Sequence, residues 1–374
     1  MNRSKCILLA LAVTGLLSAA GCSASQTESE VKEPEITDPA TITFDWQNAY
    51  ENKLKDFMSS DKYLANKKGS IGQSMFEIRD LDGDDTPELI ISPDTDLATP
   101  CEIYTYSAST LSPAGEIGNY GTFRYYPDIH ILGNEYEGQG FMLGKFVNIE
   151  EGVLNEVMSY SDNTASASSG ATIFHEINGE DVSCIEFDAA LADFNNNFSF
   201  DAGRKCTFGE KSIHEAVRCA YGWGGALTDS QKELCRNLLT EANNNAVNAN
   251  RNAAFEFCDL NADLIPELLI SDGTEEGALC HIYYFSGEEL IELEGSYGAY
   301  GQISFDIGCN VFYSVGATGT SYWSLGAESF SASDYKASDS IIDCGRLFEL
   351  SEKNIEKALS AGSDGTDTET DEAE

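Results

Sequence analysis

Two stretches of this sequence define its local architecture: Phe76-Glu-Ile-Arg-Asp-Leu-Asp-Gly-Asp-Asp-Thr-Pro-Glu-Leu-Ile-Ile-Ser92 and Phe255-Glu-Phe-Cys-Asp-Leu-Asn-Ala-Asp-Leu-Ile-Pro-Glu-Leu-Leu-Ile-Ser271. In each copy, side chains that carry oxygen fall at positions 1, 3, 5 and 9 of a short loop. They are Asp80, Asp82, Asp84 and Glu88 in the first copy, and Asp259, Asn261, Asp263 and Glu267 in the second. The repetition predicts two similar modules.

The residues around each loop predict a strand on either side of it. Apolar and polar residues alternate before the first loop, and the run Leu89-Ile90-Ile91 follows it. Pro87 and Pro266 precede the exit strands, where a missing backbone N–H does little harm. A helix-loop-helix EF-hand needs Gly at position 6 and Glu at position 12, and neither copy has them. The predicted unit is therefore strand, loop, strand.

The spacing of the oxygen-bearing side chains suits a hard cation. Calcium takes six to eight oxygen ligands, and a turning loop that aims every second side chain inward supplies many of them. Without a cation, the carboxylates of the first loop would repel one another by roughly 1 to 4 kcal/mol for each pair about 4 Å apart, depending on the dielectric. We therefore predict calcium in both loops. The alternative is an acidic turn without metal, since Asp, Asn and Gly favour turns in any case.

The motif resembles the Asp-x-Asp-Gly-Asp-x-x-Pro-Asp/Glu loops of FG-GAP and VCBS-type repeats, which are EF-hand-like calcium loops. It is also similar to modules of predicted two-module surface lipoproteins of Gram-positive anaerobes. The resemblance implies calcium as the bound ion. The second copy departs from the pattern at Asn261 and Ala262. Because calcium affinity falls with ligand charge, the second loop is expected to be a degenerate site.

The similarity of the two halves extends beyond the loops. Cys101-x-Ile-Tyr104 matches Cys280-x-Ile-Tyr283. The segments 209–217 and 351–359 both read as closing helices, and Thr228-x-x-Gln231 reads as the capping box of another helix. A further cap is predicted at Thr207-x-x-Glu210.

These matches predict an α+β fold with two similar domains, each an antiparallel β-meander with an N-terminal and a C-terminal helix. The first domain is expected at 42–224 and the second at 225–361, within the usual size range of domains. The predicted segments outside them are a signal peptide with its acylation site at 1–22, a disordered tether at 23–41 and an acidic disordered tail at 362–374.

The first residues read as an export signal. Arg3 and Lys5 precede an apolar run, which ends in Ala19-Ala20-Gly21-Cys22. Resemblance to bacterial lipoprotein signals implies cleavage before Cys22 and acylation of its thiol. The expected location is therefore the extracytoplasmic face of the cell membrane, through a lipid anchor. The alternative is simple secretion, with cleavage near Ala20.

The formal net charge of −41 excludes some partners. Such a chain repels nucleic acid phosphates and anionic lipid head groups, so we expect no nucleic acid partner. An envelope protein or a glycan remains a candidate partner, and the oligomeric state stays open. Adaptation to salt is an alternative cause of the charge, because net charge reports on solubility rather than on fold.

The cysteines, histidines and aromatic residues indicate no catalyst. Nine cysteines remain beyond Cys6 and Cys22, an odd number that excludes complete pairing within one monomer. Buried thiols are the favoured interpretation over some disulfides or zinc, since no C-x-x-C pair occurs. The four histidines form no metal or nucleophile motif. Tyrosines on the predicted strands either pack the sheet or stack on sugars or a partner protein.

Three function classes follow from these features. The leading hypothesis is a non-enzymatic, lipid-anchored protein whose calcium-stabilised modules bind a partner or polymer at the cell envelope. The alternative is a hydrolase that uses carboxylates in a cleft between the two domains, for which converging acids outside both loops would be diagnostic. A calcium buffer or sensor is the third, and it would need an opening motion.

Overall fold

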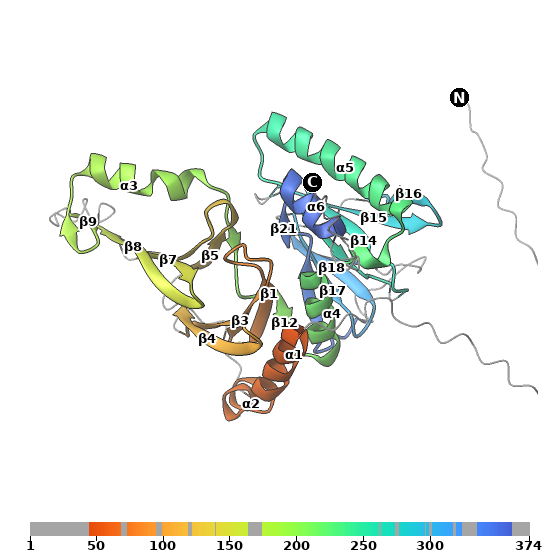
Figure 1. The fold of residues 1–374 in the computed structure, drawn as a ribbon, viewed down its shortest axis with the longest axis horizontal. Coiled ribbons are helices and arrows are strands. Elements are labelled where there is room, and N and C mark those ends of the chain that lie inside the picture. The colour runs from red at the N-terminus through yellow and green to blue at the C-terminus, as the bar shows by residue number, and fades with distance from the viewer. Residues whose placement is uncertain are drawn as a thin grey trace, which may run out of the picture. The chain divides into compact units, whose positions relative to one another are not determined.

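The computed structural model describes residues 45–68, 73–94, 99–118, 122–138, 140–163, 174–261, 263–273, 277–295, 297–298, 301–316, 319–323 and 335–360. The predicted signal peptide with Cys22, the tether and the tail lie outside the described residues, as does Ala262. The described chain mixes helices with three sheets whose strand pairs are antiparallel, which is an α+β composition (Figure 1). None of the described helices combines the length and the apolar character needed to cross a bilayer.

The largest sheet has nine strands and draws them from both halves of the sequence. Its order is β19 (Gly319–Trp323), β18 (Val311–Gly316), β17 (Ile303–Asp306), β20 (Ile341–Cys344), β12 (Cys206–Thr207), β1 (Met75–Arg79), β2 (Glu88–Ser92), β3 (Cys101–Ser107) and β4 (Thr110–Ile117). Within this sheet, the two halves join where Cys206 in β12 pairs with Ile342 in β20. The predicted domain boundary at 224/225 falls in the short 3-10 helix η3 (Gly224–Ala226).

A five-stranded sheet belongs to the second half of the chain. Its order is β16 (Glu289–Glu292), β15 (Cys280–Ser286), β14 (Glu267–Ser271), β13 (Ala254–Cys258) and β21 (Phe348–Glu349). Helices α5 (Asp229–Ala249) and α6 (Glu352–Ser360) lie side by side over it (Figure 1). Their apolar residues share one buried cluster with strands β13 and β14, including Leu239, Phe255 and Ile355.

A seven-stranded sheet is built from residues of the first half alone. Its order is β10 (Glu180–Asp181), β9 (His175–Ile177), β8 (Val153–Asp162), β7 (Phe141–Glu150), β6 (Ile131–Gly138), β5 (Thr122–Tyr126) and β11 (Phe200–Asp201). Helix α3 (Cys184–Asn196) packs on it through Phe187 and Leu191. A capping box between Ser183 and Glu186 begins this helix.

The two motif copies fold into hairpins with the same register. Met75 pairs with Ser92 and Arg79 with Glu88 in the first hairpin, while Ala254 pairs with Ser271 and Cys258 with Glu267 in the second. Every residue of the two exit strands is buried. The strand-loop-strand prediction is thus confirmed for both copies.

The remaining helices close the core around the first hairpin. Helices α1 (Asp45–Met58) and α4 (Glu210–Tyr221) pack against each other, and α2 (Asp61–Lys68) follows α1. Tyr50 is fully buried and donates a hydrogen bond to the backbone oxygen of Pro87, which ties α1 to the exit of the first loop.

The cap predicted at Thr207 is wrong, because Gly209 caps α4 and the Thr207 hydroxyl bonds the backbone of Asp339. The capping box at Thr228 is confirmed.

Each hairpin also holds a buried glutamate, at the second position of the repeated stretches 76–92 and 255–271. Glu77 accepts from the backbone N–H of Gly203 at 2.7 Å, and Glu256 accepts from that of Gly345 at 2.8 Å. Arg79 neutralises Glu77, and Lys205 neutralises Glu256. Since each glycine precedes the short strand that pairs with its hairpin, these contacts fix the return of the chain to the sheet.

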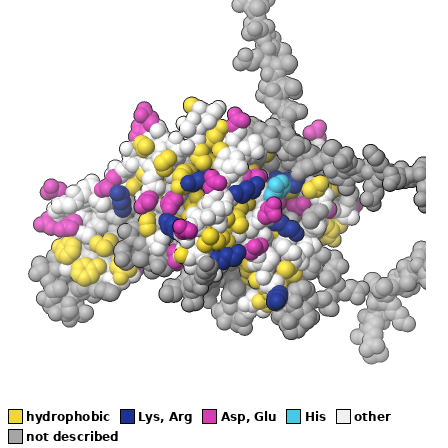
Figure 2. Space-filling model, turned by 90° about the horizontal axis from the view of Figure 1, so that it is seen from below, with side chains coloured by type: hydrophobic (Ala, Val, Ile, Leu, Met, Phe, Trp, Pro, Cys, Tyr) yellow, Lys and Arg dark blue, Asp and Glu magenta, His cyan; other side chains and the backbone are white. Residues whose placement is uncertain are grey.

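Nine cysteines in the described residues have free thiols, seven of them buried. Most strand aromatics also serve packing, since Tyr125, Tyr126 and Tyr297 are buried in the clusters. The face of the molecule in Figure 2 carries acidic and basic side chains side by side rather than a field of one sign.

Candidate metal centre

The first loop brings three of its four predicted ligands together. One side-chain oxygen each from Asp80, Asp82 and Glu88 lie within 4.8 Å of one another. Asp84 stands in the same loop, and its Oδ1 accepts from the Thr86 N–H at 2.7 Å. The turn itself is set by hydrogen bonds from Gly83 N to Asp80 Oδ1 at 2.7 Å and from Asp84 N to Asp82 Oδ1 at 3.1 Å. Asp82 therefore keeps a second carboxylate oxygen for another partner.

Glycine is required at position 4 of this loop. Gly83 has φ +81°, and a Cβ there would come within 2.6 Å of the His130 ring. His130 lies at the end of the 3-10 helix η1 (Pro127–Ile129), and Tyr125 bonds its Nδ1 at 3.3 Å. The side chain of His130 thus covers one flank of the loop.

The electrostatics of the first loop favour a bound cation. Glu88 is buried and its Oε2 accepts from the Leu81 N–H at 2.8 Å. Burial, followed by repulsion from Asp82, raises the pKa of Glu88 well above its ordinary value. Burial also raises the pKa of Asp82, with a contribution from Asp84. A divalent cation between these carboxylates would stabilise their charged forms.

The second loop shares a buried glutamate contact with the first but has a different centre. Glu267 Oε2 accepts from the Leu260 N–H at 2.6 Å, as Glu88 does from Leu81. Asn261 Oδ1 accepts from Asp263 N at 2.8 Å, so the amide nitrogen points the other way and donates to Asp263 Oδ2 at 3.0 Å and to Glu267 Oε1 at 2.9 Å. In the second loop, this NH₂ group takes the place that the second carboxylate oxygen of Asp82 has in the first loop. The amide group of Asn261 therefore links the carboxylates of the second loop by hydrogen bonds.

The closing helices reach across to the opposite loops. Lys357 of α6 places its Nζ 2.5 Å from Asp80 Oδ2 and 2.7 Å from Asp85 Oδ1. At the matching position of α4, Glu215 accepts from the Asp259 N–H at 3.3 Å. Burial raises the pKa of Glu215 to about 7. Each loop thus meets a charged side chain from the other half of the chain, a cation at the first and a carboxyl group at the second.

We expect Lys357→Met to raise the calcium affinity of the first loop about tenfold, since removing a nearby positive charge relieves repulsion of about 1.4 kcal/mol. Lys353→Met is the matched control, because Lys353 lines the same pocket without bonding Asp80. Isothermal titration with calcium measures both variants. Equal affinities for wild type and Lys357→Met would show that the ammonium and the ion do not compete.

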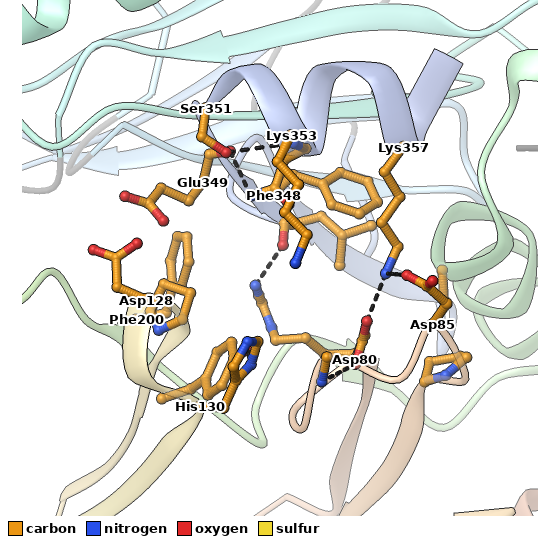
Figure 3. Close-up of a pocket in the computed structure, with 18 of the residues that line it drawn as sticks. Asp80, Asp85, Asp128, His130, Phe200, Phe348, Glu349, Ser351, Lys353 and Lys357 are labelled. Carbon is orange, nitrogen blue, oxygen red and sulfur yellow. Dashed lines mark hydrogen bonds and ion pairs between the residues drawn. The ribbon is translucent and has the colours of Figure 1, made fainter. Parts of the chain in front are cut away.

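A pocket with a volume of about 200 Å³ adjoins the first loop. Figure 3 shows Asp80, Asp85 and Lys357 on one side of it, and Asp128 and Glu349 facing each other on the other side. Burial and then repulsion by Asp128 raise the pKa of Glu349 to about 8. Asp128 lies in η1 and Glu349 in β21, so the pair joins the two halves of the sequence. With its pKa at about 8, Glu349 holds a proton at neutral pH.

Glu349→Gln is expected to flatten the pH dependence of stability. Between the unfolded pKa near 4.5 and the folded value of about 8, the native state holds a proton that the unfolded chain releases, so stability falls as pH rises. Because solvent screens this half-buried group, the difference over that range is on the order of 1 kcal/mol. Urea unfolding at several pH values measures it, with the exposed Glu289→Gln as control. If the unfolding free energies of wild type and Glu349→Gln changed with pH in parallel, the raised pKa of Glu349 would be contradicted.

Sequence reasoning missed Lys357, Asp128, Glu349 and the role of Glu215. The signal for Lys357 was present, because Glu210-Lys-x-Ile213 and Glu352-Lys-x-Ile355 align the two closing helices and place Lys357 opposite Glu215. Nothing in the sequence indicated which loop each helix meets. Comparison of the chain with protein-family models, with curated proteins and with solved structures finds no significant match.

Proposed function

We propose that the first loop binds calcium through Asp80, Asp82, Asp84 and Glu88, and that calcium is a structural ion. The observation that carries this proposal is the convergence of three carboxylates within 4.8 Å around the buried Glu88. Backbone carbonyls and water complete the oxygen shell that calcium prefers. The ion would rigidify the first hairpin and contribute about 2.7 kcal/mol to stability when free calcium is a hundredfold above its dissociation constant.

The second loop, with Asp259, Asn261, Asp263 and Glu267, binds calcium more weakly in this proposal. The Asn261 amide already bridges Asp263 and Glu267, and a cation would have to displace it. The matching hairpins and closing helices support two similar domains at 42–224 and 225–361, each a meander with an N-terminal and a C-terminal helix.

Calcium titration of matched variants tests the site. Glu88→Gln is expected to abolish the calcium-induced rise in melting temperature, because it removes a buried ligand charge. Glu267→Gln is the matched change in the second hairpin and is expected to leave most of the response intact. Calorimetry and thermal unfolding with calcium and with chelator measure both. An unchanged response in Glu88→Gln would remove the first loop as the site.

The protein as a whole is proposed to be a non-enzymatic, lipid-anchored extracytoplasmic protein that binds a partner or polymer at the cell envelope. An exposed apolar strip on the seven-stranded sheet supports the binding role. Its large side chains are two-fifths or more exposed, and they are Phe141, Leu143, Val153 and Val157. The four side chains lie on the paired strands β7 and β8, so they offer apolar contact area to a partner on this part of the sheet.

The strip and the anchor are tested separately. Leu143→Gln with Val157→Gln is expected to reduce retention by isolated envelope protein and glycan fractions, whereas Val247→Gln on α5, also exposed, is not. Mass spectrometry of the mature N-terminus tests the anchor at Cys22. An unmodified N-terminal peptide that begins elsewhere rejects the anchor without affecting the calcium site.

One observation favours a hydrolase as the second candidate function. The Asp128 and Glu349 pair lies in a pocket, outside both loops, and comes from the two predicted domains. A protonated and an ionised carboxyl group together supply a general acid and a general base. Hydrolysis of glycoside or peptide substrates that Asp128→Asn abolishes would favour this function over the non-enzymatic one.

A further inference from the structure

A second set of metal-ligating side chains lies inside the core, apart from the loop carboxylates. Glu215 and Cys219 of α4 and Cys258 at the end of β13 place their ligand atoms within 4.8 Å of one another. Cys344 at the end of β20 adds a third thiol, with its sulfur 3.5 Å from that of Cys258. Three ligand atoms thus cluster, and the Cys344 thiol lies beside one of them, Cys258.

These four side chains are shielded from solvent. Cys258 and Cys344 are 0% exposed, Cys219 is 2% exposed and Glu215 is 8% exposed. A carboxylate in such a place costs free energy unless a cation or strong donors neutralise it. Glu215 Oε1 accepts from the Asp259 N–H at 3.3 Å and from two thiols, Cys219 Sγ at 3.4 Å and Cys258 Sγ at 3.7 Å. Thiols are weak donors, so beside the charge of Arg218 a bound cation would be the strongest partner for this carboxylate.

We propose that Glu215, Cys219 and Cys258 form a structural site for a thiophilic divalent cation, with Cys344 beside Cys258 as the fourth ligand, zinc being the ion that fits. The distances around Cys258 and Glu215 fit a tetrahedral ion. With Zn–S near 2.3 Å and Zn–O near 2.1 Å, a tetrahedron has edges of about 3.8 Å between sulfurs and about 3.6 Å between sulfur and oxygen. The structure has 3.4 and 3.7 Å for the oxygen with its two thiols and 3.5 Å between the sulfurs of Cys258 and Cys344, and Cys344 would move closer to Glu215 and Cys219 when the ion binds.

The ligands also have the arrangement of a structural site. Glu215 and Cys219 stand four residues apart on one helix, which puts them on the same face. Cys258 and Cys344 come from the ends of strands in two different sheets. An ion here would link α4, β13 and β20, and so the first half of the chain to the second. It would also fix the start of the second loop, since Asp259 follows Cys258 directly.

This site is independent of the calcium proposal because it uses none of the loop carboxylates. It differs from calcium chemistry as well, since thiolates select soft metals and carboxylates select hard ones. No sequence motif indicated this site, because positions 219, 258 and 344 do not form the C-x-x-C pairs of common zinc modules.

Cobalt substitution tests the proposal on the whole chain. The protein is purified under reducing conditions, stripped with chelator and titrated with Co²⁺ and then Zn²⁺. We expect one equivalent of Co²⁺ to give a thiolate-to-cobalt charge-transfer band and the ligand-field bands of tetrahedral cobalt, and Zn²⁺ to bleach them. Elemental analysis of protein purified without chelator is expected to find one zinc per chain.

Matched variants assign the ligands. Cys258→Ser is expected to remove the charge-transfer band and weaken metal affinity at least about a hundredfold, more than outer-shell changes do. Cys235→Ser, another fully buried cysteine but on α5, is expected to leave the spectrum unchanged. If Cys258→Ser does not fold, the isosteric Glu215→Gln provides the test, with altered ligand-field bands expected. Glu88→Gln keeps the cobalt spectrum if the two sites are separate.

Two results would overturn the proposal. One is the absence of cobalt bands from the reduced wild-type chain, or their persistence in both ligand variants. The other is a disulfide between Cys258 and Cys344 in protein isolated from the cell envelope, found by peptide mapping without reduction. Such a bond would remove two thiol ligands, and these cysteines would then form a disulfide rather than a metal site.

Discussion

Lys205→Met is expected to lower the free energy of unfolding by about 3 to 5 kcal/mol, the largest effect of a single change proposed for this protein. Lys205 Nζ lies 2.8 Å from Glu256 Oε2, and the two side chains are 9% and 0% exposed. Burial lowers the pKa of Lys205, but Glu256 outweighs it, so the net direction is upward. Removing the ammonium would leave the Glu256 charge buried without its cation.

The double variant Lys205→Met with Glu256→Met distinguishes the net contribution of the ion pair from the cost of leaving one buried charge unpaired. Replacing both charges by apolar groups of similar volume is expected to recover much of the loss, because no unpaired charge stays behind. The matched control is Lys62→Met, which breaks an ion pair of the same 2.8 Å length with Glu102 at the surface. Exposed pairs of this kind contribute about 0 to 1 kcal/mol. Urea unfolding of all three variants decides the matter, and equal small losses for Lys205→Met and Lys62→Met would contradict the argument.

Asn261→Asp is expected to turn the second loop into a calcium site of the first kind. Without calcium, the change replaces two donated hydrogen bonds by repulsion among carboxylates and should destabilise the fold by about 1 to 3 kcal/mol. With calcium at a hundredfold excess over the new dissociation constant, about 2.7 kcal/mol returns. The sign of the change in stability thus depends on the ion.

Thermal unfolding with chelator and with calcium measures this reversal, and calorimetry counts the sites. The control is Asn244→Asp on the exposed face of α5, which adds the same charge away from the loop. A single calcium site in Asn261→Asp, together with a loss of stability that calcium does not restore, would mean that another feature of the second loop blocks the ion.

Local patterns predicted the parts of this fold that depend on neighbours in sequence. The alternation around residues 76–92 and 255–271 gave the hairpins, and the carboxylate spacing gave the convergence of Asp80, Asp82 and Glu88. The closing helices and the capping box at Thr228 were also readable. These features follow from backbone geometry and side-chain polarity within one or two turns of chain.

Contacts between distant segments were beyond such patterns. Lys357 meets Asp80, Glu349 meets Asp128, and Cys344 meets Cys258 because whole helices and sheets pack against one another, and packing depends on shape complementarity across the core. The same holds for the Asn261 amide, whose direction depends on which backbone N–H its oxygen accepts. The repeated motif therefore specified two acidic hairpins, whereas their three-dimensional surroundings made one a cluster of carboxylates beside a lysine and the other a loop closed by its own side chain.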